Sequence, residues 1–124
     1  MPKPLEGRRV LLVEDEFLIA SDLAQLLRRQ GAEVMGPAST VRSALELLRN
    51  APDPDAAVLD VNLRGEMAFP VADALRDRGV HFVFATGYTN EMIPERYAGV
   101  PCCEKPFDGP EIVRALSGRH AAAA

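Results

Sequence analysis

The chain has 124 residues, of which 48% are hydrophobic and 26% are charged, and its formal net charge is -4. This length suits one domain with a core of its own. The mild acidity gives no basic footprint for nucleic acid, and no apolar run approaches the ~20 residues of a membrane span. The N-terminus lacks the apolar core of a signal peptide, so we expect a cytoplasmic protein without a membrane or nucleic-acid partner.

Five short apolar runs have the length and composition of β-strands. The central run is preceded by a turn with two prolines and followed by a polar loop that contains Gly65. It is apolar enough to be buried on both faces of a parallel sheet. The five runs lie at 10–13, 33–36, 56–62, 81–85 and 101–104.

Segments with a helical spacing of apolar residues separate these strands. The first of them stops at Gly31, and the third spans roughly residues 68–78. Between the fourth and fifth strands, Pro94 and Gly99 leave room only for a shortened or irregular helix. A capping-box pattern that starts at Asp108 opens the last helix.

The alternation of five strands with helical segments predicts an α/β fold. Short connections favour a parallel sheet with helices on both faces and right-handed crossovers. The expected architecture is flavodoxin-like, a (βα)5 doubly wound sheet with strand order 2-1-3-4-5. We expect one domain over residues 1–124, with its core at about 8–118 and a flexible tail at 119–124.

Polar residues stand at the carboxyl ends of four of the predicted strands. Glu14 and Asp15 follow the first strand and Asp60 the third, while Thr86 follows the fourth and Lys105 the fifth. These ends lie along one edge of a parallel sheet, where open α/β folds bind their ligands. Each residue alone is better explained as a cap, turn or surface residue, but their joint placement favours a functional site.

The residue types at this edge suit phosphoryl chemistry. Three carboxylates held together repel one another and raise one another's pKa values, which a hard cation relieves. Oxygen ligands without His or Cys suggest Mg²⁺. A threonine hydroxyl and a lysine ammonium suit the oxygens of a phosphoryl group. We therefore expect phosphoryl transfer to a carboxylate, with catalysis mainly by positioning and charge neutralisation.

Four motifs carry a family resemblance: VLLVEDE at 10–16, LDVNL at 59–63, ATG at 85–87 and EKPF at 104–107. Together they resemble the receiver domain of bacterial two-component response regulators, over residues 8–118. The resemblance implies a signalling phosphoacceptor rather than an enzyme. Its phosphodonor would be a histidine kinase or a phosphotransfer protein.

The resemblance also implies roles for individual residues. Asp60 would be the phosphoacceptor and also a ligand of Mg²⁺, which Asp15 would bind directly. Glu14 would act on the metal mainly through water, and the backbone carbonyl of Asn62 would be a further ligand. The implied phosphoryl-binding switch residues are Thr86 and Lys105, supported by Gly87, Tyr88 and Pro106.

A narrower resemblance concerns residues 84–88, which read Phe-Ala-Thr-Gly-Tyr as in the FAT GUY receivers. Members of that subgroup are stand-alone regulators, and similar receivers occur in hybrid histidine kinases, so both contexts stay open. Because no DNA-binding segment follows the receiver, we expect output through a protein partner. The expected contact face lies between the fourth and fifth helices, on a monomer or weak dimer.

The chain departs from the common receiver pattern at Cys102, where many receivers carry a Tyr or Phe coupled to the threonine. Tyr88 is either a substitute aromatic reporter or a partly exposed loop tyrosine, and the sequence leaves both open. Cys102 and Cys103 are adjacent, so we expect two small strand residues rather than a disulfide or a zinc site.

Two other functions match part of the pattern. The sequence Asp60-Val61-Asn62 faintly resembles the Asp-x-Asp motif of haloacid-dehalogenase-type phosphatases. Asn62 cannot supply the acid–base group of that motif, however, and the motif follows the third strand instead of the first. A binding module with a vestigial site would require the loss of a site residue, and none is missing.

Overall fold

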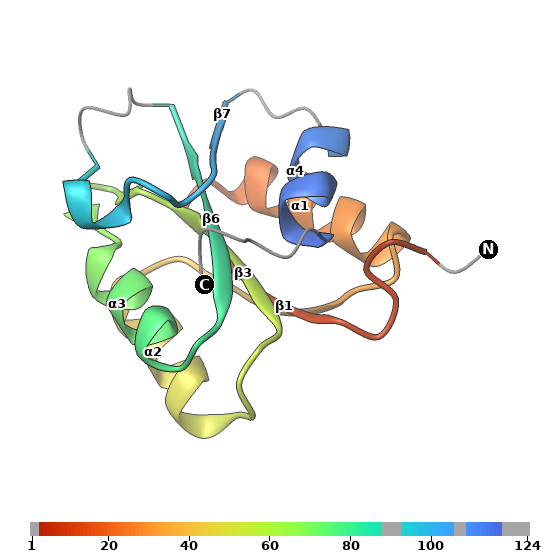
Figure 1. Ribbon diagram of the computed structural model, residues 1–124, viewed down its shortest axis with the longest axis horizontal. Helices are drawn as coiled ribbons and strands as arrows, with labels where there is room; N and C mark the ends of the chain where they lie inside the picture. Colours follow the sequence, from red (N-terminus) through yellow and green to blue (C-terminus); the bar gives the residue numbers. More distant parts are fainter. Residues whose placement is uncertain (1–2, 88–92, 106–108, 118–124) are drawn as a thin grey trace.

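An open parallel β-sheet forms the centre of the computed structural model, which describes residues 3–87, 93–105 and 109–117 (Figure 1). The strand order is β2-β1-β3-β6-β7. Numbered within this sheet alone, that order is 2-1-3-4-5, so the predicted flavodoxin-like fold is confirmed. The strands are β1 (Arg9–Val13), β2 (Glu33–Ala38), β3 (Ala56–Asp60), β6 (His81–Thr86) and β7 (Cys102–Glu104).

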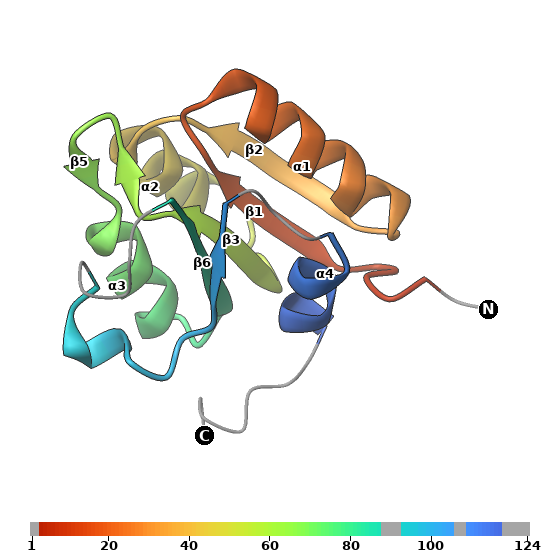
Figure 2. The ribbon, with the colours of Figure 1, turned by 90° about the horizontal axis from the view of Figure 1, so that it is seen from above.

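Helices cover both faces of the sheet, with α1 and α4 on one face and α2 and α3 on the other (Figure 2). In the described parts of the chain, none of them has the length and apolarity needed to cross a membrane. The helices are α1 (Phe17–Arg29), α2 (Val41–Asn50), α3 (Phe69–Asp77) and α4 (Gly109–Ser117).

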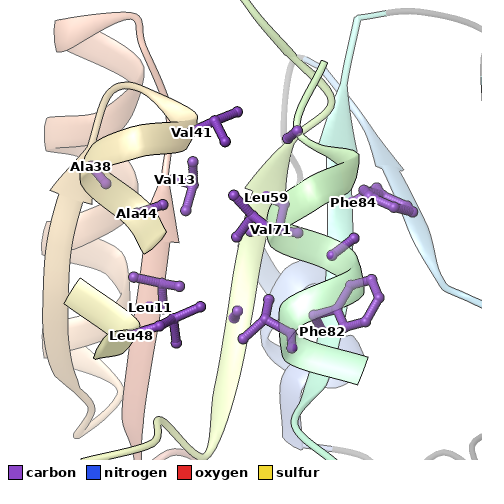
Figure 3. Packing of buried hydrophobic residues seen from close by; sticks show 14 of the residues in the cluster. Leu11, Val13, Ala38, Val41, Ala44, Leu48, Leu59, Val71, Phe82 and Phe84 are labelled. Carbon is purple, nitrogen blue, oxygen red and sulfur yellow. The ribbon is translucent and has the colours of Figure 1, made fainter. Parts of the chain in front are cut away.

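Both faces of the central strands are buried, because successive side chains of a strand point to opposite faces. On β1, Leu11 and Val13 pack against the α2 and α3 layer (Figure 3), whereas Val10 and Leu12 pack against α1 and α4. This two-sided burial explains why the strands appear as uninterrupted apolar runs in the sequence. Each fully buried Leu or Val contributes about 1.5–3 kcal/mol to folding.

Strand β2 continues through Pro37 to Ala38, although the sequence pattern suggested an end at Gly36. The proline is tolerated because β2 is the outermost strand, where a residue without an N–H removes no ladder bond to a further strand. Gly36 has a φ of 99°, and a Cβ there would lie 2.9 Å from the carbonyl oxygen of Leu12. The strand therefore requires glycine at this irregular point.

The loop after Asp60 contains a short antiparallel hairpin that the sequence analysis did not predict. Its strands are β4 (Asn62–Leu63) and β5 (Glu66–Met67). The two turn residues, Arg64 and Gly65, both have positive φ values, 54° and 93°. Two left-handed central residues define the type I′ turn, whose twist matches that of a hairpin.

Between β6 and β7, the described residues form a single 3-10 turn, η2 (Glu95–Tyr97). This matches the predicted shortened or irregular fourth helix. Tyr97 is 1% exposed and anchors the turn to the core. Its ring stacks on Phe69 of α3 at a centroid distance of 5.6 Å and meets Phe84 of β6 edge to face at 5.5 Å.

The hydroxyl of Tyr97 is fixed by polar contacts with α3. It donates a hydrogen bond to the carboxylate of Asp73 and lies 3.2 Å from the carbonyl oxygen of Phe69. The guanidinium groups of Arg76 and Arg96 lie 4.9 and 4.7 Å from the centre of its ring. Tyr97 thus joins η2 to α3 by stacking, hydrogen bonding and cation–π contacts.

We predict that Tyr97→Phe lowers the free energy of unfolding by about 1 kcal/mol, because it removes the hydroxyl but keeps the ring. Tyr97→Ala should cost about 3–5 kcal/mol, because it leaves a cavity between α3 and β6. Urea unfolding followed by circular dichroism measures both values. Equal losses for the two variants would contradict the prediction that ring packing dominates.

Candidate functional site

Asp60 is the last residue of the central strand β3, and it is buried with 4% of its surface exposed. Its Oδ2 lies 3.1 Å from Nζ of Lys105. Its Oδ1 accepts a 3.3 Å hydrogen bond from the backbone N–H of Asn62. Both carboxylate oxygens are therefore oriented by groups from the loops that follow β3 and β7.

Glu14 and Asp15 follow β1, the neighbour of β3 in the sheet. The backbone N–H of Glu14 donates to the carbonyl of Ala38 at the end of β2, which fixes the residue at the sheet edge. Oε2 of Glu14 accepts a hydrogen bond from the backbone N–H of Glu16. Ligand oxygens of Glu14, Asp15 and Asp60 all lie within 4.8 Å of one another.

Lys105 brings a positive charge between two of these carboxylates. Its Nζ lies 3.1 Å from Oε1 of Glu14 and 3.1 Å from Oδ2 of Asp60. Its backbone N–H donates to the carbonyl of Thr86, the fully buried last residue of β6. The ends of β1, β3, β6 and β7 are thereby linked at one point of the sheet edge.

Burial governs the protonation of Asp60. Loss of hydration, followed by repulsion from Glu14, raises the pKa of Asp60 from 3.8 to about 7, although Lys105 acts in the opposite direction. Burial also tends to lower the pKa of Lys105, but its contacts with Glu14 and Asp60 outweigh that effect and raise this pKa. Lys105 therefore stays charged, while Asp60 loses its proton only as the pH approaches its raised pKa of about 7.

A pocket of about 390 Å³ opens above the carboxylates. Its volume and polar lining suit a small charged group together with a hydrated cation. The residues that line it are Asp15, Glu16, Asp60, Asn62, Arg64, Gly65, Gly87 and Lys105.

The donor set fits a hard divalent cation such as Mg²⁺. It consists of carboxylate oxygens alone, which hard cations prefer. Among the described residues, Oε1 of Glu14 is buried and accepts no hydrogen bond, and its charge is balanced by the ion pair with Lys105 at 3.1 Å. An added positive charge would satisfy this oxygen and relieve the repulsion among the three carboxylates.

The structure brings together Glu14, Asp15, Asp60 and Lys105. Gly87 lines the same pocket, and Thr86 is connected to Lys105 through its backbone carbonyl. The side-chain oxygen of Asn62 accepts a hydrogen bond from Gly65, so the role predicted for its backbone carbonyl concerns a different atom. Tyr88 and Pro106 lie outside the described residues, as does the expected flexible tail at 119–124.

Sequence reasoning missed Arg64, which also lines the pocket. Its Nε lies 3.6 Å from Oδ2 of Asp15. An exposed arginine in a polar loop gives no signal by itself. The Arg-Gly pair after Asn62 could have indicated a tight hairpin turn next to the predicted site.

Comparison with known proteins places the chain in a family. The sequence profile described as response regulator receiver domain matches residues 10–117. The chain is therefore a member of the receiver domain family of response regulators, which are signalling phosphoacceptors of two-component systems. Its assignment to the FAT GUY subgroup stays a prediction.

The chain is similar to the transcriptional regulatory protein PdtaR of Mycobacterium tuberculosis, with 30% identity over 88% of this chain and 55% of PdtaR. The solution structure of SdrG from Sphingomonas melonis Fr1 has a TM-score of 0.76 and 39% identity, covering 91% of this chain and 97% of SdrG. Its BeF3-activated conformation, attributed to Pseudomonas melonis Fr1, has a TM-score of 0.73 and 40% identity, covering 88% of this chain and 92% of that one.

The response regulator PhyR from Brucella abortus has a TM-score of 0.72 and 31% identity, covering 88% of this chain and 45% of PhyR. The chain thus spans about half the length of PdtaR and of this PhyR. SdrG, in contrast, is matched along nearly its whole length.

We predict that Asp60→Asn stabilises the metal-free protein at about pH 8 by about 1–2 kcal/mol, because it removes a buried carboxylate that is costly to ionise. The pKa of Asp60 is raised in the folded state from 3.8 to about 7, so its contribution is favourable below about pH 4 and is lost as the pH rises to about 7. Urea unfolding in EDTA at about pH 5 and pH 8 measures the difference.

The matched control is Asp22→Asn, which removes an exposed carboxylate of α1. That change should leave the pH dependence of unfolding as in the wild type. If Asp60→Asn and the wild type lose the same stability between the two pH values, the raised pKa of Asp60 is refuted.

Proposed function

We propose that this chain is a phosphoacceptor switch in which Asp60 receives a phosphoryl group with the help of Mg²⁺. The observation that carries the proposal is the environment of the Asp60 carboxylate. It lies at the end of the central strand, opens to the pocket and contacts Lys105, with two further carboxylates within metal-binding distance. Membership of the receiver family supports the same chemistry.

The proposed donor is a phosphohistidine on a histidine kinase or a phosphotransfer protein. A carboxylate oxygen of Asp60 attacks the phosphorus, and the phosphorus–nitrogen bond breaks. The electron pair of that bond goes to the imidazole, and an acyl phosphate forms on Asp60. In-line transfer of this kind depends mainly on positioning and on neutralising the phosphoryl charge.

Bound Mg²⁺ would supply charge neutralisation at the phosphoryl oxygens. We propose that Asp15 and Asp60 would hold it directly, that the backbone carbonyl of Asn62 would be a further ligand and that Glu14 would act through water. The support for this assignment is the spacing of the three carboxylates and the burial of the Glu14 carboxylate, whose Oε1 accepts no hydrogen bond and pairs with Lys105.

Lys105 and Thr86 are the proposed sensors of the phosphoryl group. Lys105 already contacts Oδ2 of Asp60 and would follow the charge onto a phosphoryl oxygen. We propose that the hydroxyl of Thr86 donates to a second phosphoryl oxygen. Since the backbone N–H of Lys105 is bonded to the carbonyl of Thr86, the two sensors are mechanically connected.

We propose that the output is contact with a protein partner on the face formed by η2, β7 and α4. Strand β7 is the outermost strand on this side of the sheet and ends at the residue before Lys105. A change at Lys105 is thus one residue away from this face. A cytoplasmic location and a monomeric or weakly dimeric state belong to the same proposal, whether the receiver acts alone or within a hybrid histidine kinase.

We predict that the protein gains the mass of one phosphoryl group when it is incubated with Mg²⁺ and acetyl phosphate, because Asp60 is a positioned nucleophile. Intact-protein mass spectrometry measures the gain. EDTA should abolish it, and Lys105→Ala should lower its yield by about ten-fold or more, because one charge-assisted phosphoryl contact is lost.

Asp60→Asn should show no gain, whereas Asp22→Asn on the exposed face of α1 should behave as the wild type. A gain that persists in Asp60→Asn would show that another residue is modified and would refute the proposed acceptor. Absence of any gain in the wild type would refute the phosphoacceptor function itself.

A further inference from the structure

Arg64 brings a second cation to the pocket. It pairs with a different carboxylate from the two that Lys105 contacts. Lys105 contacts Glu14 and Asp60, whereas Arg64 pairs with Asp15 at 3.6 Å. The Lys105 side chain is 16% exposed, but that of Arg64 is 81% exposed. The lysine is therefore built into the site, and the arginine reaches it from solvent.

The backbone at Arg64 forms a tight turn next to the pocket. Arg64 has a φ of 54°, a left-handed conformation that costs an ordinary residue roughly 1 kcal/mol or more. The turn is held in place by a 2.6 Å hydrogen bond from the N–H of Gly65 to the side chain of Asn62. It is also held by the pairing of β4 with β5.

We propose that Arg64 competes with Mg²⁺ for Asp15 and so sets the metal affinity of the site. The inference rests on the proposed metal-binding function and adds a residue that regulates it. The side chain of Asp15 is only 9% exposed, so its charge needs a partner when no metal is bound. Arg64 supplies that partner and must be displaced when a divalent cation takes the same carboxylate.

The displacement is feasible because Arg64 is largely in solvent. Released from Asp15, the guanidinium is fully hydrated at small cost, and the ion pair it gives up is of the weak, partly exposed kind. Arg64 therefore lowers the affinity for metal by a small factor and leaves the site able to bind it. A receiver with this device would need a somewhat higher concentration of free Mg²⁺ for half-saturation than one without it.

The test is the dissociation constant for Mg²⁺, measured by isothermal titration calorimetry with the wild type and Arg64→Ala. We expect the variant to bind Mg²⁺ about two- to five-fold more tightly, which corresponds to losing one partly exposed ion pair. Arg64→Lys, which keeps the charge, should stay closer to the wild type. Arg64→Gly removes the charge with a residue that favours positive φ, and should bind as tightly as Arg64→Ala.

Arg42→Ala is the matched control, because it removes another largely exposed arginine, this one from α2, where Arg42 pairs with Glu46 at 3.3 Å. Both variants lose one positive charge, so Arg42→Ala reports how the change in net charge alone affects Mg²⁺ binding. We expect this variant to bind Mg²⁺ as the wild type does. The amide signals of Gly65 and Gly87 in NMR spectra provide a second measure of binding at the pocket.

The outcomes separate the two proposals. If the wild type binds Mg²⁺ and Arg64→Ala binds no more tightly than Arg42→Ala, the role of Arg64 is overturned while the proposed function stands. If the wild type does not bind Mg²⁺ at the pocket, both are overturned. Tighter binding by both Arg64→Ala and Arg64→Gly, but not by Arg42→Ala, supports competition for Asp15.

Discussion

The interaction on which the site depends is the ammonium of Lys105 lying between the buried carboxylates of Glu14 and Asp60. Without Lys105, two negative charges buried this deeply would repel each other strongly and destabilise the adjacent carboxyl ends of β1 and β3. Lys105 compensates only part of this charge, since the pKa of Asp60 still rises to about 7. The negative charge that remains uncompensated makes this edge of the sheet suited to a divalent cation. The two apolar clusters that cover the sheet provide the stability that offsets the cost of burying these charges.

The arrangement of these residues could be predicted from the sequence because it follows from the strands. Apolar runs fix where β1, β3 and β7 end, and parallel topology brings those ends to one edge, so Glu14, Asp60 and Lys105 had to meet. Arg64 could not be predicted in the same way. Its contact with Asp15 depends on a two-residue turn with both residues left-handed, and an arginine at the first turn position is not the usual Asn or Asp.

The anchor at Tyr97 was also missed, for a related reason. Its partners Phe69, Asp73 and Phe84 come from α3 and β6, and nothing in the local sequence of a short turn indicates such distant contacts. Local patterns predicted that a regular helix would not fit between β6 and β7, because Pro94 limits it. They could not predict that the shortened segment would be fixed by a buried aromatic ring, since that depends on the space left between α3 and the sheet.

The ring of Tyr97 also lies where a conformational change at Thr86 would be transmitted to η2. Cys102 stands where many receivers carry an aromatic residue, and it pairs with Phe84 across the β6–β7 ladder. Tyr97 packs edge to face on Phe84 in the same cluster, which Cys102 borders. The aromatic side chain next to Phe84 in this region therefore comes from η2, whereas β7 contributes the small Cys102. Because Phe84 lies two residues before Thr86, the strand that carries the proposed sensor is in direct contact with the ring that holds η2 to α3.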